Sequence, residues 1–259
     1  MIFKEALDIK PGDVISLVGG GGKTTLMFAL ARELASNTGC VVTTTTTKIF
    51  EPLPSETPLL LLETNGQEMI RLLLQNMDKY QHITLATERL ASGKLNGIGS
   101  ELVIKLAELN QVSYLIVEAD GAAHKSLKAP NPTEPVIPRS TTLVIPVVGI
   151  DALGCQLNEE NVFRPNIVSK LTGLALGKII TADVIATMVT HPEGIAKGSP
   201  ARARIIPFLN KMDLDDGLPR GRTLAAKILE KRHPQISKVI LGQVQAAEPV
   251  VQIISAPNQ

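Results

Sequence analysis

Apolar residues along the chain fall into two alternating patterns. Short apolar runs predict buried strands, and apolar residues that recur every three or four positions predict amphipathic helices. The runs lie at 14–18, 40–42, 59–62, 82–87, 112–119, 141–148, 205–209, 239–241 and 250–254. Helical spacing marks 2–9, 26–35, 67–79, 102–109, 158–175, 181–190 and 218–231. Strands that alternate with helices predict an α/β fold, with a mostly parallel sheet flanked by helices.

Segments without either pattern indicate loops. Asn37 and Thr38 are expected to stop the first long helix, 93–97 reads as a loop, and the four prolines of 130–138 exclude a helix there. No internal repeat or low-complexity linker divides the chain. We therefore expect one domain over residues 1–259, in which about 155–200 could form a helical insertion.

Composition and charge narrow the classes of function. Of the 259 residues, 44% are apolar and 20% are charged, which is an ordinary globular balance. The net charge of +1 provides no electrostatic footprint for nucleic acid or an anionic membrane. Two cysteines, Cys40 and Cys155, are too few for a disulfide framework. With no apolar run of membrane-spanning length, we expect a cytoplasmic protein that binds neither nucleic acid nor membrane.

The strand at 14–18 runs into a glycine loop and then a helix, which is the order typical of a phosphate-binding loop (P-loop). Glycines let backbone N–H groups approach phosphate oxygens, and the helix N-terminus adds partial positive charge. Lys23 would reach the β- and γ-phosphates from an exposed position beyond the strand, and the Thr24 hydroxyl would bind Mg²⁺. Leu17 stands where the full motif has its first glycine, so an ordinary glycine-rich turn is the alternative. The expected nucleotide-binding residues here are Gly19, Gly20, Gly21, Gly22, Lys23, Thr24 and Thr25.

Two carboxylates, Glu118 and Asp120, end the apolar run at 112–119. Residues two apart in an extended segment point to the same face. At the carboxyl end of a strand in a P-loop protein, one carboxylate could bind Mg²⁺ and the other could orient an attacking water. Both are therefore expected metal ligands with Thr24 and expected catalytic residues with Lys23. A strand end followed by an Asp-Gly turn is the alternative.

Two further segments could face the same edge of the sheet. The five threonines 43–47 and Lys48 could supply hydroxyl donors to phosphate or metal-bound water, or could form a solvated strand edge. Lys125 and Lys128 could add positive charge for an anionic substrate. His124 and His191 have no metal-ligand spacing, which favours structural or surface roles.

The segment Asn210-Lys211-Met212-Asp213 follows the strand at 205–209. The Asp213 carboxylate could accept two hydrogen bonds from guanine N1–H and the exocyclic amine, a pair that adenine cannot offer. Asn210 and Lys211 would brace the base and the glycine loop, and the backbone at 255–256 could contact the guanine oxygen. A strand-to-helix turn with Asp213 or Asp215 as a helix cap is the alternative. The pattern predicts GTP in preference to ATP.

Several stretches, read in order, resemble the selenium-dependent hydroxylase accessory protein (YqeC) family. They are 18–25, 43–48, 117–121, 127–130, 134–138, 149–154, 163–164, 191–194 and 209–213, whereas 123–126 matches poorly. The resemblance implies a P-loop protein that assists maturation of selenium-dependent molybdenum hydroxylases. A selenium- or molybdenum-cofactor intermediate or a hydroxylase apoenzyme would then be its partner. It also implies that Asp151, Arg164 and His191 belong to the working surface.

These observations together predict a P-loop NTPase that uses Mg²⁺ and GTP or ATP for hydrolysis or phosphoryl transfer. Two alternatives stay open. One is a nucleotide-gated chaperone or carrier with little turnover. The other is a small-molecule kinase or ligase, whose acceptor would bind near His191, Arg164 and Lys128.

Overall fold

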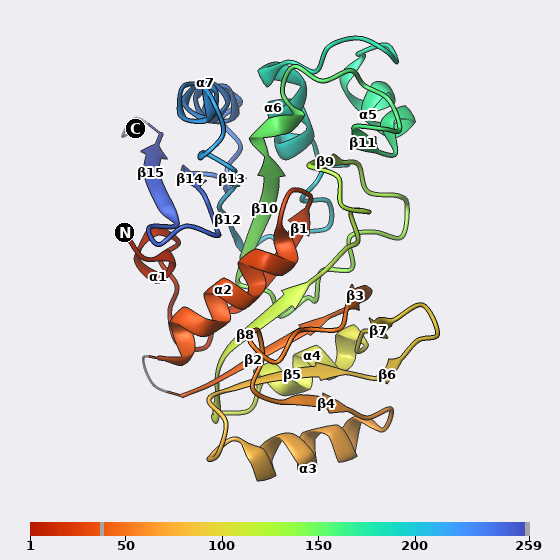
Figure 1. Ribbon diagram of the computed structural model, residues 1–259, viewed down its shortest axis with the longest axis vertical. Helices are drawn as coiled ribbons and strands as arrows, with labels where there is room; N and C mark the ends of the chain where they lie inside the picture. Colours follow the sequence, from red (N-terminus) through yellow and green to blue (C-terminus); the bar gives the residue numbers. More distant parts are fainter. Residues whose placement is uncertain (37–38, 257–259) are drawn as a thin grey trace.

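A ten-stranded sheet forms the centre of the protein in the computed structural model, which describes residues 1–36 and 39–256 (Figure 1). The strand order is β15-β14-β13-β10-β1-β8-β2-β5-β4, and β12 also pairs with β10. All of these pairings are parallel except that of the edge strand β15. The predicted α/β fold with a mostly parallel sheet is confirmed. The strands are β1 (Val14–Gly19), β2 (Cys40–Thr45), β4 (Leu60–Leu62), β5 (His82–Ala86), β8 (Val112–Glu118), β10 (Leu143–Gly149), β12 (Arg204–Ile205), β13 (Phe208–Asn210), β14 (Lys238–Gly242) and β15 (Val250–Ser255).

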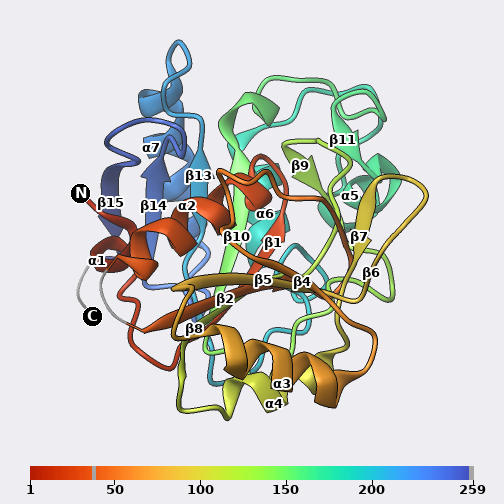
Figure 2. The same ribbon diagram turned by 60° about the horizontal axis from the view of Figure 1, so that its bottom comes forward.

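Helices cover both faces of the sheet, as Figures 1 and 2 show. In β1, Ile15 and Leu17 face the core under α1 and α2, whereas Val14 and Val18 face the opposite side. This alternation follows from the two-residue period of a strand. The helices are α1 (Phe3–Ala6) and α2 (Lys23–Ala35) on the first face, and α3 (Gly66–Asn76), α4 (Ser100–Ala107), α5 (Pro165–Thr172), α6 (Ala182–Thr190) and α7 (Gly217–Glu230) on the second.

Prolines explain two differences from the predicted elements. The helix expected at 158–175 begins only at Pro165, a residue suited to the first helical position. The strand expected at 205–209 is divided into β12 and β13, because Pro207 lacks the N–H that a continuous ladder requires.

The predicted helix stop at 37–38 lies outside the described residues. Within the part of the chain that the structure describes, no helix is long and apolar enough to cross a bilayer.

A small antiparallel sheet occupies the segment that was expected to be a loop at 93–97. It consists of β3 (Lys48–Phe50), β7 (Lys94–Asn96) and β6 (Glu88–Arg89). Ile49 and Leu95, at the centres of β3 and β7, are buried. The loop prediction was wrong because two- and three-residue strands are too short for a periodic pattern. A second small sheet pairs β9 (Leu127–Lys128) with β11 (Val162–Phe163).

Parallel pairing brings four chain segments to one edge of the sheet. β1, β8, β10 and β13 all end there, and the last residue of each is a glycine or a polar residue. Ligands of open α/β sheets bind beyond these carboxyl ends. A functional site is therefore expected at this edge of the sheet.

His82 gives the sheet a measurable dependence on pH. Its ring is buried at the start of β5, with Nε2 2.9 Å from the Thr43 hydroxyl. Burial, helped by the charge of Arg32, lowers the pKa of His82 from 6.5 to about 4. Between these pH values the unfolded chain binds a proton that the folded chain does not, so stability falls as the pH is lowered.

We predict that His82→Gln removes this loss of folding stability at low pH. At pH 5 the proton binding of His82 alone should cost the native protein about 2 kcal/mol relative to pH 7. Urea unfolding of both proteins at the two pH values measures the difference. If both lose the same free energy of unfolding, His82 does not titrate as described.

Candidate functional site

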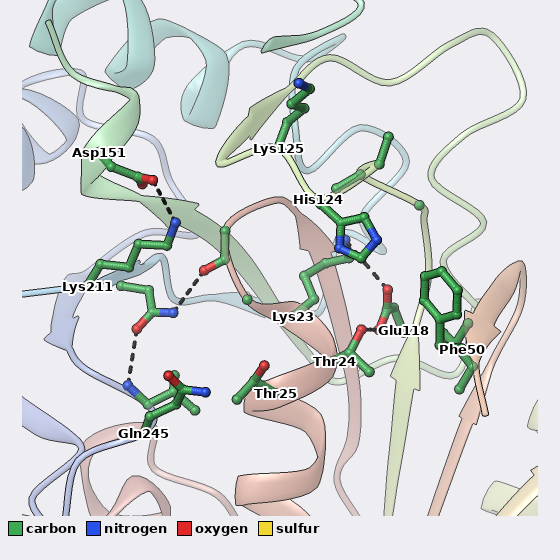
Figure 3. A pocket seen from close by; sticks show the side chains of 18 of the residues that line it. Lys23, Thr24, Thr25, Phe50, Glu118, His124, Lys125, Asp151, Lys211 and Gln245 are labelled. Carbon is green, nitrogen blue, oxygen red and sulfur yellow. Dashed lines mark hydrogen bonds and ion pairs between the residues drawn. The ribbon is translucent and has the colours of Figure 1, made fainter. Parts of the chain in front are cut away.

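A cavity of about 820 Å³ lies at the carboxyl edge of the sheet (Figure 3). Its walls come from the glycine loop and first turn of α2, from β3, and from the segments after β8, β13 and β14. The strand pairing that unites these elements places residues more than two hundred positions apart around one hollow. The cavity falls within the 300–1,000 Å³ typical of small-molecule sites.

The glycine loop lies tightly against the end of β10. Gly19 and Gly21 adopt positive φ values of 93° and 76°. A Cβ on Gly19 would lie 2.4 Å from the Val147 carbonyl oxygen, and one on Gly21 would lie 2.2 Å from the Gly149 nitrogen. Leu17, by contrast, is still inside β1 with its side chain buried in the core. The shortened loop is therefore formed without a glycine at position 17.

Only part of the glycine loop faces the cavity. The N–H groups of Gly20 and Gly21 already donate to the carbonyl oxygens of Val147 and Lys125, at 2.8 and 2.9 Å. The N–H groups that begin α2 have no intrahelical acceptor and carry the positive end of the helix dipole. Of the seven predicted binding residues, Gly21, Gly22, Lys23, Thr24 and Thr25 line the cavity, and Gly19 and Gly20 lie behind it.

Lys23 is buried, with 4% of its surface exposed, so the expectation that it is exposed was wrong. Its Nζ donates to the Gly19 carbonyl at 2.8 Å and lies 3.2 Å from Asp120 and 3.6 Å from Glu118. Burial lowers the pKa of the ammonium, but the two carboxylates outweigh burial and raise it above its usual value. The strand β8 lies next to β1, and its terminal carboxylates draw this cation inward.

Glu118 and Asp120 both reach Lys23, which confirms that they share a face, but their surroundings differ. Glu118 lines the cavity and accepts a hydrogen bond from the Thr24 hydroxyl at 2.6 Å. Burial raises the pKa of its carboxyl, and the Lys23 charge acts in the opposite direction. Asp120 is fully buried, where it accepts from the Gly19 N–H at 3.1 Å and pairs with Lys128 at 2.9 Å.

A chain of alternating charges continues from Asp120 away from the glycine loop. Lys128 pairs with Glu134 at 3.1 Å, and Glu134 pairs with Arg164 at 2.6 Å. Burial raises the pKa of Glu134, but the two cations outweigh it and hold the pKa below its ordinary value. Lys128 is itself fully buried, so the expectation that it attracts a substrate directly was wrong. Sequence reasoning missed Glu134 as its partner.

Asn210 and Lys211 brace the opposite side of the cavity. The Asn210 amide donates to the Gly21 carbonyl at 2.8 Å and accepts from the Val244 N–H at 3.1 Å. Lys211 Nζ bonds to Asp151 at 2.6 Å and to the Ser126 hydroxyl at 2.8 Å. The predicted contact of Asn210 with the glycine loop is thus present in the structure.

Asp213 is exposed on the cavity wall, and its side chain forms no hydrogen bond with the described residues. The segment 243–246 after β14 lines the same wall, and Figure 3 shows Gln245 below Lys211. Sequence reasoning missed this segment and chose 255–256 instead. Ala256 pairs with Ser237 before β14, at the opposite end of that strand, so that choice was wrong.

The threonine run is structural for most of its length. Thr43, Thr44 and Thr45 are fully buried in β2. Their hydroxyls bond to Thr84, to the Leu85 carbonyl and to the Glu118 carbonyl, at 2.7 to 2.8 Å. These three hydroxyls are not available to a phosphate. Thr46 and Thr47, at the end of the run, line a smaller cavity together with Lys48, which also lines the main cavity.

The three residues that the family resemblance assigned to the working surface, Asp151, Arg164 and His191, lie at three different places. Asp151 lines the main cavity, and Arg164 lines a second, smaller cavity. His191 ends α6, where its Nδ1 accepts from the Glu193 N–H at 3.0 Å, and it lines neither cavity. His124, for which a structural or surface role was expected, stacks on the exposed Phe50 ring with centroids 5.5 Å apart.

The side chains at the glycine loop fit a magnesium ion better than a metal held by protein ligands alone. Thr24 and Glu118 offer adjacent oxygen donors, the type that Mg²⁺ prefers. Within residues 1–36 and 39–256 there is no cluster of three or more His, Cys, Asp or Glu side chains able to hold a metal. Mg²⁺ requires no such cluster, because it keeps waters and substrate phosphates as ligands.

Comparison with known proteins identifies the same family as the sequence resemblance. The YqeC protein family matches residues 15–166, which include the glycine loop, Glu118, Asp120, Asp151 and Arg164. The chain is also 33% identical over 198 residues to the uncharacterized protein YqeC of Escherichia coli (strain K12). That match covers 76% of this chain and 75% of the relative. The chain belongs to the YqeC family.

Proposed function

We propose that this protein binds a nucleoside triphosphate with Mg²⁺ at the glycine loop and hydrolyses it or transfers its phosphoryl group. One observation carries the proposal: Lys23, Thr24 and Glu118 meet at the N-terminus of α2, inside a cavity of suitable size. At that position the cation can bind phosphate, and the hydroxyl and the carboxylate can bind Mg²⁺, as phosphoryl transfer requires.

Each residue has a distinct part in this proposal. The N–H groups of Lys23, Thr24 and Thr25, which have no acceptor within α2, bind phosphate oxygens. The Lys23 ammonium moves from the Gly19 carbonyl to the phosphates. Thr24 and Glu118 hold Mg²⁺, which when bound stabilises charge on the transferring group. Asp120, fixed by Lys128, keeps the glycine loop in shape.

The base-binding end favours GTP over ATP in this proposal. Asp213 lies on the cavity wall next to Lys211 and the 243–246 segment, and no described residue occupies its acceptors, which guanine donors would then use. Asn210 ties that wall to the Gly21 carbonyl. Movement of the base-binding wall would therefore be transmitted to the glycine loop through Asn210.

The biological role that we propose is assistance in the maturation of selenium-dependent molybdenum hydroxylases. Support comes from the family resemblance alone, and the partner would be a selenium- or molybdenum-cofactor intermediate or a hydroxylase apoenzyme. Repeated turnover of GTP by the isolated protein would favour an NTPase. A single burst of hydrolysis would instead indicate a nucleotide-gated chaperone or carrier.

We predict that isosteric changes in the two carboxylates affect different properties, the Mg²⁺ requirement for Glu118 and the stability of the fold for Asp120. Glu118→Gln should raise the Mg²⁺ concentration required for half-maximal GTP hydrolysis at least tenfold, because it removes the charge beside Thr24. Asp120→Asn should leave that requirement unchanged. It should lower the free energy of unfolding by about 3 kcal/mol, because the buried ammonium groups of Lys23 and Lys128 lose the carboxylate that they share. Magnesium titrations and urea unfolding of both variants measure these effects. Wild-type magnesium dependence in Glu118→Gln would show that the carboxylate is structural.

We also predict that Asp213→Asn exchanges the preferred base. The new amide can donate to the xanthine carbonyl that replaces the guanine amine, so XTP should compete better than GTP. Asp215→Asn, an exposed change outside the cavity lining, is the matched control and should keep the wild-type order. Competition against a fluorescent GTP measures the order. Equal affinity of the wild type for ATP and GTP would contradict the guanine assignment, as would an unchanged order in Asp213→Asn.

A further inference from the structure

A second cavity of about 460 Å³ adjoins the first on the side away from Asp213. The two cavities share Lys48, Lys94, Gly121 and Ala123 as lining residues. In Figure 3 Lys211 and Gln245 lie to one side of Thr24 and Glu118, and Phe50, from the strand that carries Lys48, lies to the other. The second cavity therefore begins past Glu118, where the terminal phosphate of a bound nucleotide would lie. Its other lining residues are Thr46, Thr47, Asn96, Glu134, Phe163 and Arg164.

The small sheet of β3, β7 and β6 directs its polar face at this space. Lys48 pairs with Asn96 and Phe50 pairs with Lys94 in the antiparallel register, so alternate residues of both strands share one face. Ile49 and Leu95 occupy the other face, where they are buried. Burial of these two apolar side chains fixes which face carries the lysines.

The second cavity carries an excess of positive charge. Three cations, Lys48, Lys94 and Arg164, line it with a single carboxylate, Glu134. Arg164 pairs with Glu134 at 2.6 Å. Neither lysine has an ion-pair partner within the described residues, and Lys94 lies 4.8 Å from the centre of the Phe50 ring. Since the whole chain carries a net charge of only +1, this excess is local.

Ion pairs connect one wall of the second cavity to Lys23, at the end of the glycine loop. Arg164, Glu134, Lys128, Asp120 and Lys23 form a continuous series of ion pairs of 2.6 to 3.2 Å. The inner members are almost completely buried, where such pairs are least screened by salt. The series therefore fixes Glu134 and Arg164, on one wall of the second cavity, relative to Lys23.

We propose that the second cavity binds the acceptor of the phosphoryl group, a small molecule that carries a carboxylate or phosphate held by Lys48 and Lys94. This inference rests on the proposed nucleotide chemistry. An acceptor oxygen forms a bond to the γ-phosphorus, the bond from that phosphorus to the bridging oxygen breaks, and the nucleoside diphosphate leaves. If the acceptor is a hydroxyl group, its proton passes to water.

Inorganic phosphate is the probe for this site. The protein is first saturated with Mg²⁺ and a non-hydrolysable GTP analogue, which fills the glycine loop, and phosphate is then added. The backbone amide resonances of Asn96 and Phe163 should shift with a saturable dependence on phosphate. The double change Lys48→Ala, Lys94→Ala should weaken phosphate binding at least tenfold. The control Lys10→Ala, Lys105→Ala removes two exposed lysines outside both cavities and should stay within twofold of the wild type.

Separate results would overturn the two proposals. Normal binding of the GTP analogue without any phosphate-dependent shift would overturn the acceptor site alone. Equal phosphate affinity in the two double variants would do the same, because the anion would not depend on Lys48 and Lys94. Failure of the GTP analogue to bind would overturn the proposed function and, with it, the acceptor role.

Discussion

The buried contact between Lys23 and Asp120 is the interaction on which the rest of the site depends. At 3.2 Å it joins the first residue of α2 to the segment just past β8. Asp120 also accepts from the Gly19 N–H and pairs with Lys128. Loss of one partner from such a buried pair leaves an uncompensated charge and costs about 3 to 5 kcal/mol. The glycine loop, the carboxylates and the second cavity are thus positioned by one network of charge.

The parallel sheet determines what this network can reach. Because β1, β8, β10 and β13 end at the same edge, the carboxylates, Asp151, Asn210 and the glycine loop surround one cavity. In the nucleotide arrangement that we propose, the phosphates lie on α2, the base lies near Asp213 and the terminal phosphate lies near Glu118. Beyond Glu118 lies the cationic second cavity, so the hollow offers room for two ligands in series.

Sequence predicted the elements that have strong local signals. The long strands and most helices follow from apolar periodicity, and the glycine loop follows from its four glycines between a strand and a helix. The Asn210 contact with the loop follows from its place after a strand. The burial of Lys23 and Lys128 could not be predicted, because it depends on carboxylates about 100 and 6 residues away in the chain. The strands β3 and β7 were missed because three residues cannot show a period. Prolines shortened or divided elements whose apolar pattern continued across them.

The most direct test of the account is equilibrium binding of Mg·GTP to Lys23→Met. Methionine keeps most of the side-chain volume and removes the charge, while Asp120 keeps Lys128 as a counter-ion at 2.9 Å. We expect affinity to fall at least 100-fold, or about 3 kcal/mol, with the fold retained by circular dichroism. Lys105→Met, an exposed change on α4, should bind as the wild type does. Binding of Mg·GTP by Lys23→Met within twofold of the wild type would contradict the assignment of the glycine loop as the phosphate site.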